Sequence, residues 1–408
     1  MNLKSIFTAC LVLTTVSVPA QDIFVSTHNG AVANFRANST AMTYSETGQK
    51  LTIQGTTFNT ADINSITLNA PSGMKYVGGD ISRLPEFETA GAVYKDASGN
   101  TITPLTFFKE QGWNAIRVRL FVNPSTTATD GAVQSLDFVT KLGKRIKDAG
   151  YQFMLDFHYS DTWADPSKQY IPTSWTKDKS ASALQDTLYN YTKRCLQHLV
   201  ANGAQPDLIQ TGNEISYGML WDVGKVQAYS TSNWDVFTGM LKRAIAACRE
   251  VCPKAKVIIH TERSGDATTS VKYYSLIKQY GVDYDIIGLS YYPFYHGFLP
   301  ALETTLTNLE SNFPNKKIMI VEFGYHHAWY PSNATFNYTA TYPATNAGQK
   351  AITDDLITLL KKHSQVNGLF WWYPEENSAL NNWLNYGLFD CYDDNKALPA
   401  LFELKNFK

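Results

Sequence analysis

Two glutamates stand where a strand-like apolar run gives way to a loop, and both could do acid–base or nucleophilic chemistry. Glu214 ends the run 206–214, and Glu322 ends the run 318–322. Two carboxylates across one cleft suit glycoside hydrolysis, in which a protonated carboxyl assists the leaving group and an ionised carboxylate attacks or activates water. The plainer alternative is that one of the two is a salt-bridge carboxylate.

Other polar or aromatic side chains also gather where apolar runs end. Buried charges at such positions are costly unless they are paired, so many of them converging on one rim favour an active site. The set comprises Asp80, Ser82, Arg117, Arg119, Asp156, His158, Asn213, His260, Glu262, Tyr291, Tyr292 and Trp372.

Strand-like and helix-like segments alternate from Met74 onward. After the first strands, Leu136, Val139, Leu142 and Ile146 recur at near-helical spacing, and Gly150 ends that helix. Eight segments read as strands, at 76–81, 115–122, 153–158, 208–212, 257–260, 286–291, 318–321 and 369–372.

Eight strand–helix units over residues 74–408 predict a (β/α)₈ TIM barrel with its site at the carboxyl ends of the strands. Glu214 and Glu322 then follow the fourth and seventh strands, whose ends can face each other across the mouth. A doubly wound open sheet is the alternative fold. That fold usually carries a glycine-rich phosphate loop after its first strand, and this sequence has none there.

The first 73 residues read differently. Lys4 precedes an apolar stretch to Val18, and Val18-Pro19-Ala20 resembles a cleavage site, so residues 1–20 predict a secretory signal peptide. Lipidation of Cys10 is an alternative. Residues 21–73 show period-2 alternation around Leu51 and predict a small all-β module, with an immunoglobulin type as one possibility.

Composition narrows the functional class. The 408 residues are 44% hydrophobic with a net charge of −1, which excludes a disordered chain and gives no basic footprint for nucleic acid. No run is long enough to span a membrane. The 13% aromatic share fits core packing and also a carbohydrate site, since sugars stack their C–H faces on aromatic rings.

From residue 76 to the C-terminus, about four fifths of the chain, the sequence resembles the endo-β-1,4-galactanases of glycoside hydrolase family 53, within the clan-A barrels. The run from Asp156 is long and specific, whereas an Asn-Glu pair alone would indicate only the clan. The segments that carry the resemblance are 79–82 (GDIS), 116–119 (IRVR), 156–166 (DFHYSDTWADP), 211–214 (TGNE), 290–293 (SYYP) and 321–325 (VEFGY).

The resemblance implies retaining endo-hydrolysis of β-1,4-galactan, with Glu214 as acid/base and Glu322 as nucleophile. Asn213 would contact the sugar 2-hydroxyl, Trp372 would lie under the ring, and either Tyr291 or Tyr292 would hydrogen-bond Glu322. Arg117 fits the clan arginine beside the nucleophile, although Arg119 shares its face. The remaining expected substrate-binding residues are Asp80, His158, Asp161, Trp163 and His260.

The loop after Glu322 departs from that family pattern. Some bacterial relatives carry an acidic calcium loop there, whereas residues 326–333 contain no acidic residue. Zinc at His326 and His327 is a weak alternative, and we expect no metal and no cofactor. Trp329 and Tyr330 are expected to stack on distal sugars.

The sequence therefore predicts an exported monomer that acts on galactan and binds neither nucleic acid nor a membrane. Its final location could be periplasmic, surface-held or secreted. Two alternatives stay open: a clan-A endo-glycanase for mannan, xylan or glucan, and an inactive sugar-binding barrel.

Overall fold

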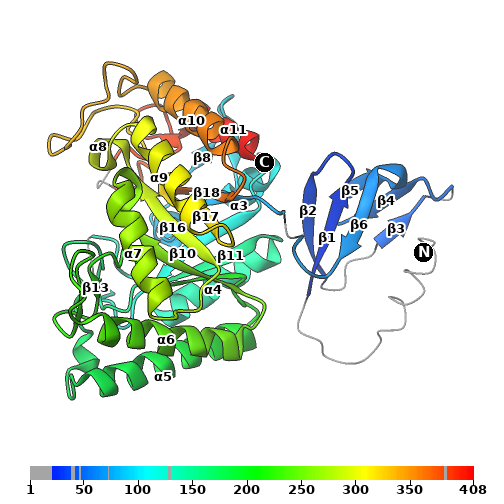
Figure 1. Ribbon diagram of the computed structural model, residues 1–408. Helices are drawn as coiled ribbons and strands as arrows, with labels where there is room; N and C mark the ends of the chain where they lie inside the picture. Colours follow the sequence, from blue (N-terminus) through cyan, green and yellow to red (C-terminus); the bar gives the residue numbers. More distant parts are fainter. Residues whose placement is uncertain (1–20, 38–41, 46, 72, 127–129, 381–383) are drawn as a thin grey trace. The chain divides into compact units, whose positions relative to one another are not determined.

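The computed structural model describes residues 21–37, 42–45, 47–71, 73–126, 130–380 and 384–408. The expected signal peptide, with Cys10, lies outside this part of the chain. The fold divides into two compact units, Met1–Pro71 and Ser72–Lys408 (Figure 1).

The larger unit is a closed barrel of eight parallel strands, which confirms the predicted fold. The strands follow one another around the barrel in chain order, and the last pairs with the first. Their bounds are β7 (Tyr76–Asp80), β10 (Ala115–Leu120), β11 (Gln152–Phe157), β12 (Leu208–Thr211), β15 (Lys256–Thr261), β16 (Ile286–Tyr291), β17 (Lys317–Phe323) and β18 (Val366–Trp372).

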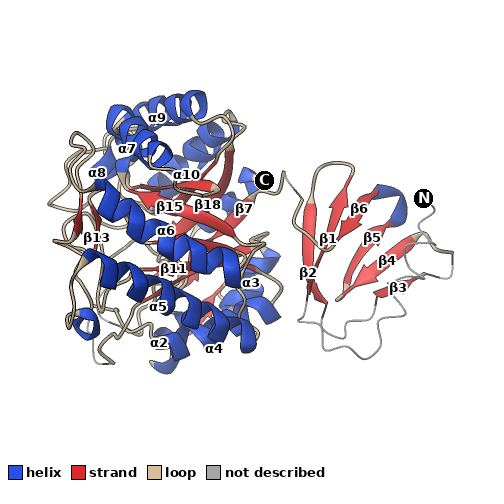
Figure 2. Ribbon diagram, turned by 60° about the horizontal axis from the view of Figure 1, so that its bottom comes forward, coloured by secondary structure: helices blue, strands red, loops and turns tan. Residues whose placement is uncertain are grey.

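Helices surround the barrel strands, as Figure 2 shows. The α-helices are α2 (Leu84–Thr89), α3 (Pro104–Glu110), α4 (Leu136–Asp148), α5 (Ala181–Ala201), α6 (Trp234–Val251), α7 (Ala267–Gln279), α8 (Pro293–His296), α9 (Leu299–Asn312), α10 (Asn346–Lys361) and α11 (Pro399–Glu403). Short 3₁₀ turns are η2 (Thr173–Trp175), η3 (Arg263–Gly265) and η4 (Leu404–Phe407).

Local chemistry explains where these helices begin and end. At α4 the Ser135 hydroxyl accepts the backbone N–H of Phe138, which satisfies one of the free donors of the first turn. The apolar face of α4, with Leu142 and Ile146, is buried against the strands. Gly150 follows with a φ of 76°, a left-handed conformation that ends the helix at little cost.

Short strands in the loops of the barrel unit pair with one another. One small sheet combines segments from both ends of the unit, β8 (Tyr94–Lys95), β9 (Thr101–Ile102), β19 (Phe389–Asp390) and β20 (Lys396–Ala397). Another is the hairpin of β13 (Gly218–Met219) and β14 (Gly224–Lys225), which follows the fourth barrel strand.

The smaller unit contains two three-stranded antiparallel sheets with a buried centre that includes Val25, Phe35 and Leu51. This core shares no buried residue with the barrel core among the described residues. The elements are β1 (Gln21–Thr27), β2 (Val32–Ala37), β3 (Met42–Tyr44), β4 (Lys50–Ile53), β5 (Thr56–Asn59), η1 (Thr60–Asp62) and β6 (Ile63–Thr67).

None of the helices in the described part of the chain is long and apolar enough to cross a membrane.

Candidate active site

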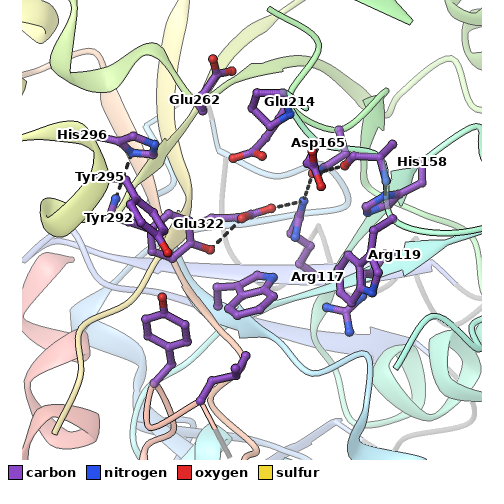
Figure 3. A pocket seen from close by; sticks show the side chains of 17 residues that line it. Arg117, Arg119, His158, Asp165, Glu214, Glu262, Tyr292, Tyr295, His296 and Glu322 are labelled. Carbon is purple, nitrogen blue, oxygen red and sulfur yellow. Dashed lines mark hydrogen bonds and ion pairs between the residues drawn. The ribbon is translucent and has the colours of Figure 1, made fainter. Parts of the chain in front are cut away.

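The two glutamates predicted from the sequence open into one cavity of about 510 Å³ at the carboxyl ends of the barrel strands (Figure 3). Glu214 follows β12, and Glu322 is the last residue but one of β17. The lining comprises Arg117, Arg119, His158, Trp163, Ala164, Asp165, Pro166, Asn213, Glu214, Glu262, Tyr292, Tyr295, His296, Glu322, Trp372, Leu384 and Tyr386.

Both oxygens of Glu322 are held by neighbours. Arg117 Nη2 lies 2.8 Å from Oε1, and the Tyr292 hydroxyl donates to Oε2 at 2.7 Å. Arg117 is fully buried and also pairs with Asp80 and Asp156, each at 2.7 Å. A buried cation with three carboxylate partners stays charged, so Arg117 fixes a positive charge beside Glu322.

Opposing effects set the charge state of Glu322. Burial raises its pKa, while the Arg117 guanidinium and the Tyr292 hydroxyl act in the opposite direction. The pKa of Glu322 is still raised by burial, but less than that of Glu214, so Glu322 is the more acidic of the two glutamates.

Glu214 is held in a different environment. Its backbone adopts a left-handed φ of 48°, two residues after Gly212, whose φ is 107°. Strained backbone at such a position persists only where the surroundings enforce it. Here the Ser290 hydroxyl donates to Glu214 Oε1 at 2.7 Å, which fixes the carboxyl group toward the cavity.

His260 holds Ser290 in place, and Ser290 in turn holds the carboxyl group of Glu214. Burial lowers the pKa of His260 well below its usual range, and the charge of Arg117 adds to this, so the ring is neutral. Its Nδ1 lies 2.7 Å from Gln210 Nε2, 3.3 Å from the Glu214 backbone nitrogen and 3.1 Å from Asn213 Oδ1. The Ser290 hydroxyl, which donates to Glu214, accepts from His260 Nε2 at 2.8 Å, so the neutral ring carries its proton on Nε2.

The acidity of Glu214 differs from that of Glu322. Burial raises the pKa of Glu214 well above its usual range, and the negative charges of Glu322 and Glu262 raise it further. No lysine or arginine in the described residues forms an ion pair with Glu214. The two carboxyl groups, which are chemically identical, thus differ in acidity: Glu214 holds its proton more strongly than Glu322, which is the pattern of an acid paired with a nucleophile.

Asn213 and the aromatic residues form the rest of the cavity wall. The Asn213 side chain is oriented by donation to Ala164 O at 2.8 Å and by acceptance from Arg117 at 3.0 Å. Trp163 and Trp372 meet edge to face at 6.3 Å. Aromatic walls next to fixed polar groups suit a sugar ring, which has both apolar and hydroxyl-bearing surfaces.

Most residues predicted to bind substrate lie on this wall. The cavity brings together Arg117, Arg119, His158, Trp163, Asn213, Tyr292 and Trp372 with the two glutamates. Of the two tyrosines considered as partners of Glu322, Tyr292 makes the hydrogen bond. Tyr291 is fully buried and donates instead to Gly297 O at 3.1 Å.

Three other expected residues do not line the cavity. Asp80 is fully buried, with one oxygen on Arg117 and the other on Arg119. Asp161 accepts the backbone N–H groups of Asn123 and Thr173, so it holds two loops together. His260 contacts the cavity residues Asn213 and Glu214, the latter directly at its backbone and through Ser290 at its carboxyl group, but it does not line the cavity itself.

Sequence reasoning assigned no role to several residues of the site. Ser290 belongs to segment 290–293, which carries the family resemblance, and Glu262 follows an apolar run. The sequence therefore contained a pattern that pointed to each of them. Tyr295 and His296 follow the Tyr-Pro pair on α8. Tyr386 carried no signal, because it lies 14 residues beyond the strand from which its loop departs.

No group of three or more His, Cys, Asp or Glu side chains in the described residues is arranged to hold a metal ion. His326 and His327, the two residues considered for zinc, both have pKa values lowered by burial. The aromatic rings of Tyr386 and Trp329 lie 4.3 and 4.7 Å from the His326 ring.

Comparisons with known proteins identify the family of the chain. The model of glycosyl hydrolase family 53 matches residues 76–404. The arabinogalactan endo-β-1,4-galactanase A of Aspergillus niger is 32% identical, over 83% of this chain and 97% of its own length. The arabinogalactan endo-β-1,4-galactanase of Cellvibrio japonicus is also 32% identical, over 81% of this chain and 90% of its own.

A solved structure from a study of two fungal β-1,4-galactanases superimposes with a TM-score of 0.71. It is 30% identical, over 81% of this chain and 99% of that one. A closed parallel barrel with paired glutamates at its mouth, and a family match over most of the chain, define a glycoside hydrolase. The chain belongs to glycosyl hydrolase family 53.

The charge of Glu262 offers a test of this electrostatic arrangement. Glu262→Gln should shift the alkaline limb of the kcat/KM–pH profile to lower pH. With Glu214 assigned as the acid, this limb reports the deprotonation of Glu214, and removing a neighbouring negative charge lowers the pKa of Glu214. Arg263, which pairs with Glu262 at 2.9 Å, would act in the same direction once unpaired.

The control is Glu310→Gln, which removes a glutamate that pairs with His363 away from the cavity. The Glu310 variant should keep the wild-type limb. An alkaline limb that stays in place, or moves to higher pH, in the Glu262 variant would show that Glu262 does not tune the acid.

Proposed function

We propose that this protein is an exported, retaining endo-β-1,4-galactanase that cleaves the galactan of arabinogalactan and pectic side chains. The observation that carries the proposal is the unequal environment of Glu214 and Glu322 in a chain whose family relatives are named as galactanases. The apolar run after Lys4 supports export.

In the first step, Glu322 attacks the anomeric carbon while Glu214 donates its proton to the departing glycosidic oxygen. The bond to the leaving sugar breaks, and a covalent glycosyl–enzyme forms on Glu322. Arg117 and the Tyr292 hydroxyl hold the Glu322 carboxylate in place for this attack.

In the second step, Glu214 acts as a base and Glu322 is the leaving group. Once Glu322 is esterified, its negative charge no longer raises the pKa of Glu214, so Glu214 remains ionised after giving up its proton. Glu214 then removes a proton from water, which attacks the anomeric carbon and releases Glu322. Two inversions give net retention.

A panel of purified polysaccharides, assayed for reducing ends, tests the substrate. We expect release from β-1,4-galactan and little from mannan, xylan or glucan. Hydrolysis of another member of the panel in preference to galactan would make the protein a different clan-A glycanase. Binding of galactan without release of reducing ends would indicate an inactive sugar-binding barrel.

The β-module is expected to be dispensable for soluble substrates. Deleting residues 21–72 should leave specific activity on soluble galactan within severalfold, because every cavity residue follows Met74 and each unit has its own core. Circular dichroism and the reducing-end assay measure this. A folded truncation that lost activity would show that the module contributes to the substrate cleft.

A further inference from the structure

A chain of buried hydrogen bonds connects Glu214 to the ion pairs of the barrel interior. Its members are Gln210, His260 and Ser290, whose side chains are all fully buried. Gln210 Nε2 lies 2.7 Å from His260 Nδ1, and His260 Nε2 lies 2.8 Å from Ser290 Oγ. Ser290 Oγ lies 2.7 Å from Glu214 Oε1. A histidine nitrogen and a hydroxyl can each donate or accept, so these distances alone allow either direction along the chain.

Buried charges at the far end of the chain fix the orientation of the Gln210 amide. Its Nε2 donates to Asp156 Oδ1 at 2.7 Å, and its Oε1 accepts from Arg117 Nε at 3.4 Å. Asp156 and Arg117 form an ion pair with each other at 2.7 Å. Turning the amide over would place its oxygen against the carboxylate and its NH₂ group against the guanidinium. Gln210 therefore presents a donor, and not an acceptor, to His260.

The donor of Gln210 determines the direction of every later hydrogen bond. A neutral imidazole has one protonated nitrogen, and since Nδ1 of His260 accepts from Gln210, the ring proton lies on Nε2. Asn213 Oδ1 also lies 3.1 Å from Nδ1, but this oxygen already accepts from the buried guanidinium at 3.0 Å, and the Gln210 contact is shorter. Nε2 then donates to Ser290 Oγ, so the proton of the Ser290 hydroxyl is directed at Glu214 Oε1.

We propose that Gln210 is a positioning residue that sets the direction of this chain, so that Ser290 donates to Glu214 Oε1 and the acid carries its proton on Oε2. This inference deepens the proposed retaining mechanism and rests on it. In the first step Oε2 gives its proton to the departing glycosidic oxygen. The Ser290 hydroxyl keeps its own proton, and no proton moves along the chain. Its hydrogen bond strengthens as negative charge develops on Glu214, which favours this step.

Ser290→Ala tests the last link of the chain through its dependence on the leaving group. For β-1,4-galactan, kcat/KM should fall by roughly 10- to 100-fold, the scale of one hydrogen bond to a charged group. For a dinitrophenyl galactobioside, whose leaving group needs little protonation, kcat/KM should change little. Ser290→Thr keeps the hydroxyl and should retain most of the rate on galactan. The control Thr305→Val removes a buried hydroxyl that donates to Ala301 O at 3.1 Å within α9, and it should keep both rates.

The pH profile of Ser290→Ala separates this role from a merely structural one. The Ser290 hydrogen bond lowers the pKa of Glu214, so its loss raises that pKa, while the charged neighbours Glu322, Glu262 and Asp165 are retained. The alkaline limb of kcat/KM for galactan should therefore move to higher pH, opposite to the shift expected for Glu262→Gln. Equal losses for the two leaving groups, or a limb that stays in place or moves to lower pH, would overturn the role of Ser290.

Nitrogen-15 NMR of histidine-labelled protein tests the direction of the chain itself, because protonated and unprotonated ring nitrogens have well-separated chemical shifts. The signals of His260 are those that disappear in His260→Asn. In the wild-type protein we expect the ring proton on Nε2. In Gln210→Glu a carboxylate oxygen replaces the amide donor, so the proton should move to Nδ1, and kcat/KM for galactan should fall as in Ser290→Ala.

Two NMR results would overturn the inference: a wild-type His260 protonated on Nδ1, or a His260 that stays protonated on Nε2 in Gln210→Glu. The NMR measurement needs no substrate, so it can be distinguished from a failure of the proposed function. A wild-type enzyme that did not hydrolyse galactan would overturn the proposed function, whatever the position of the His260 proton.

Discussion

Glu322→Ala should abolish turnover of galactan and of activated aryl galactosides alike, with kcat lower by roughly 10⁴-fold or more. The loss should not depend on the leaving group, because the nucleophile itself is removed. The fold should survive, since Arg117 retains Asp80 and Asp156 as partners. Steady-state rates on galactan and on a dinitrophenyl galactobioside measure the effect.

Azide identifies the role of the missing group. In Glu322→Ala the space beside the anomeric carbon admits azide, which would displace the leaving group in a single inversion and give the α-glycosyl azide. Glu303→Ala, which removes a partly exposed glutamate paired with Lys362, is the control and should retain wild-type rates. A β-azide from the Glu322 variant would contradict its assignment as nucleophile.

Glu214→Ala should show a loss that depends strongly on the leaving group. Natural galactan needs a proton on the departing oxygen, so its hydrolysis should slow by roughly 10²–10⁴-fold. An acidic phenol needs little protonation, so formation of the glycosyl–enzyme from a dinitrophenyl galactobioside should be largely preserved. Pre-steady-state release of the phenol measures that first step separately from the second.

Added azide should accelerate the second step in Glu214→Ala, because azide needs no general base. It would attack the glycosyl–enzyme on Glu322 and give the β-glycosyl azide after two inversions. Equal loss on both leaving groups would argue against Glu214 as the acid. If the two variants gave the opposite anomers, the roles of Glu214 and Glu322 would have to be exchanged.

The barrel could be predicted from the sequence because its signals are local and repeated. Each of the eight strands appears as a short apolar run, and Gly150 marks the end of a helix whose buried face recurs at 3.6-residue spacing. Both glutamates were identifiable because each directly follows such a run. Alternation within β10 likewise placed Arg117 and Arg119 on one face, and both line the cavity.

The choice between Tyr291 and Tyr292 illustrates what the sequence could not provide. Neighbouring residues of a strand face opposite sides, so one of the two had to turn inward. The pairing of β16 with β17 shifts register between Leu289 and Ser290. Such an irregularity changes the direction of the side chains that follow it, and no local sequence pattern predicts its position in the strand.

Long-range contacts explain the other residues whose roles in the structure differ from those predicted from the sequence. Asp161 sits in the most specific motif of the chain, yet it accepts backbone N–H groups from two separate loops. His260 acts on Glu214 through Ser290, which is 30 residues further along the chain. Tyr386 reaches the cavity because its loop returns toward the barrel mouth, a path set by the buried Glu376.

The anomeric configuration of the first product tests the central claim most directly. Hydrolysis of β-1,4-galactan by the wild-type enzyme can be followed by proton NMR before mutarotation proceeds. Double displacement by Glu322, with Glu214 as acid and then base, predicts that new reducing ends appear as the β-anomer and convert to the α-anomer only later. Initial release of the α-anomer would contradict the assigned mechanism.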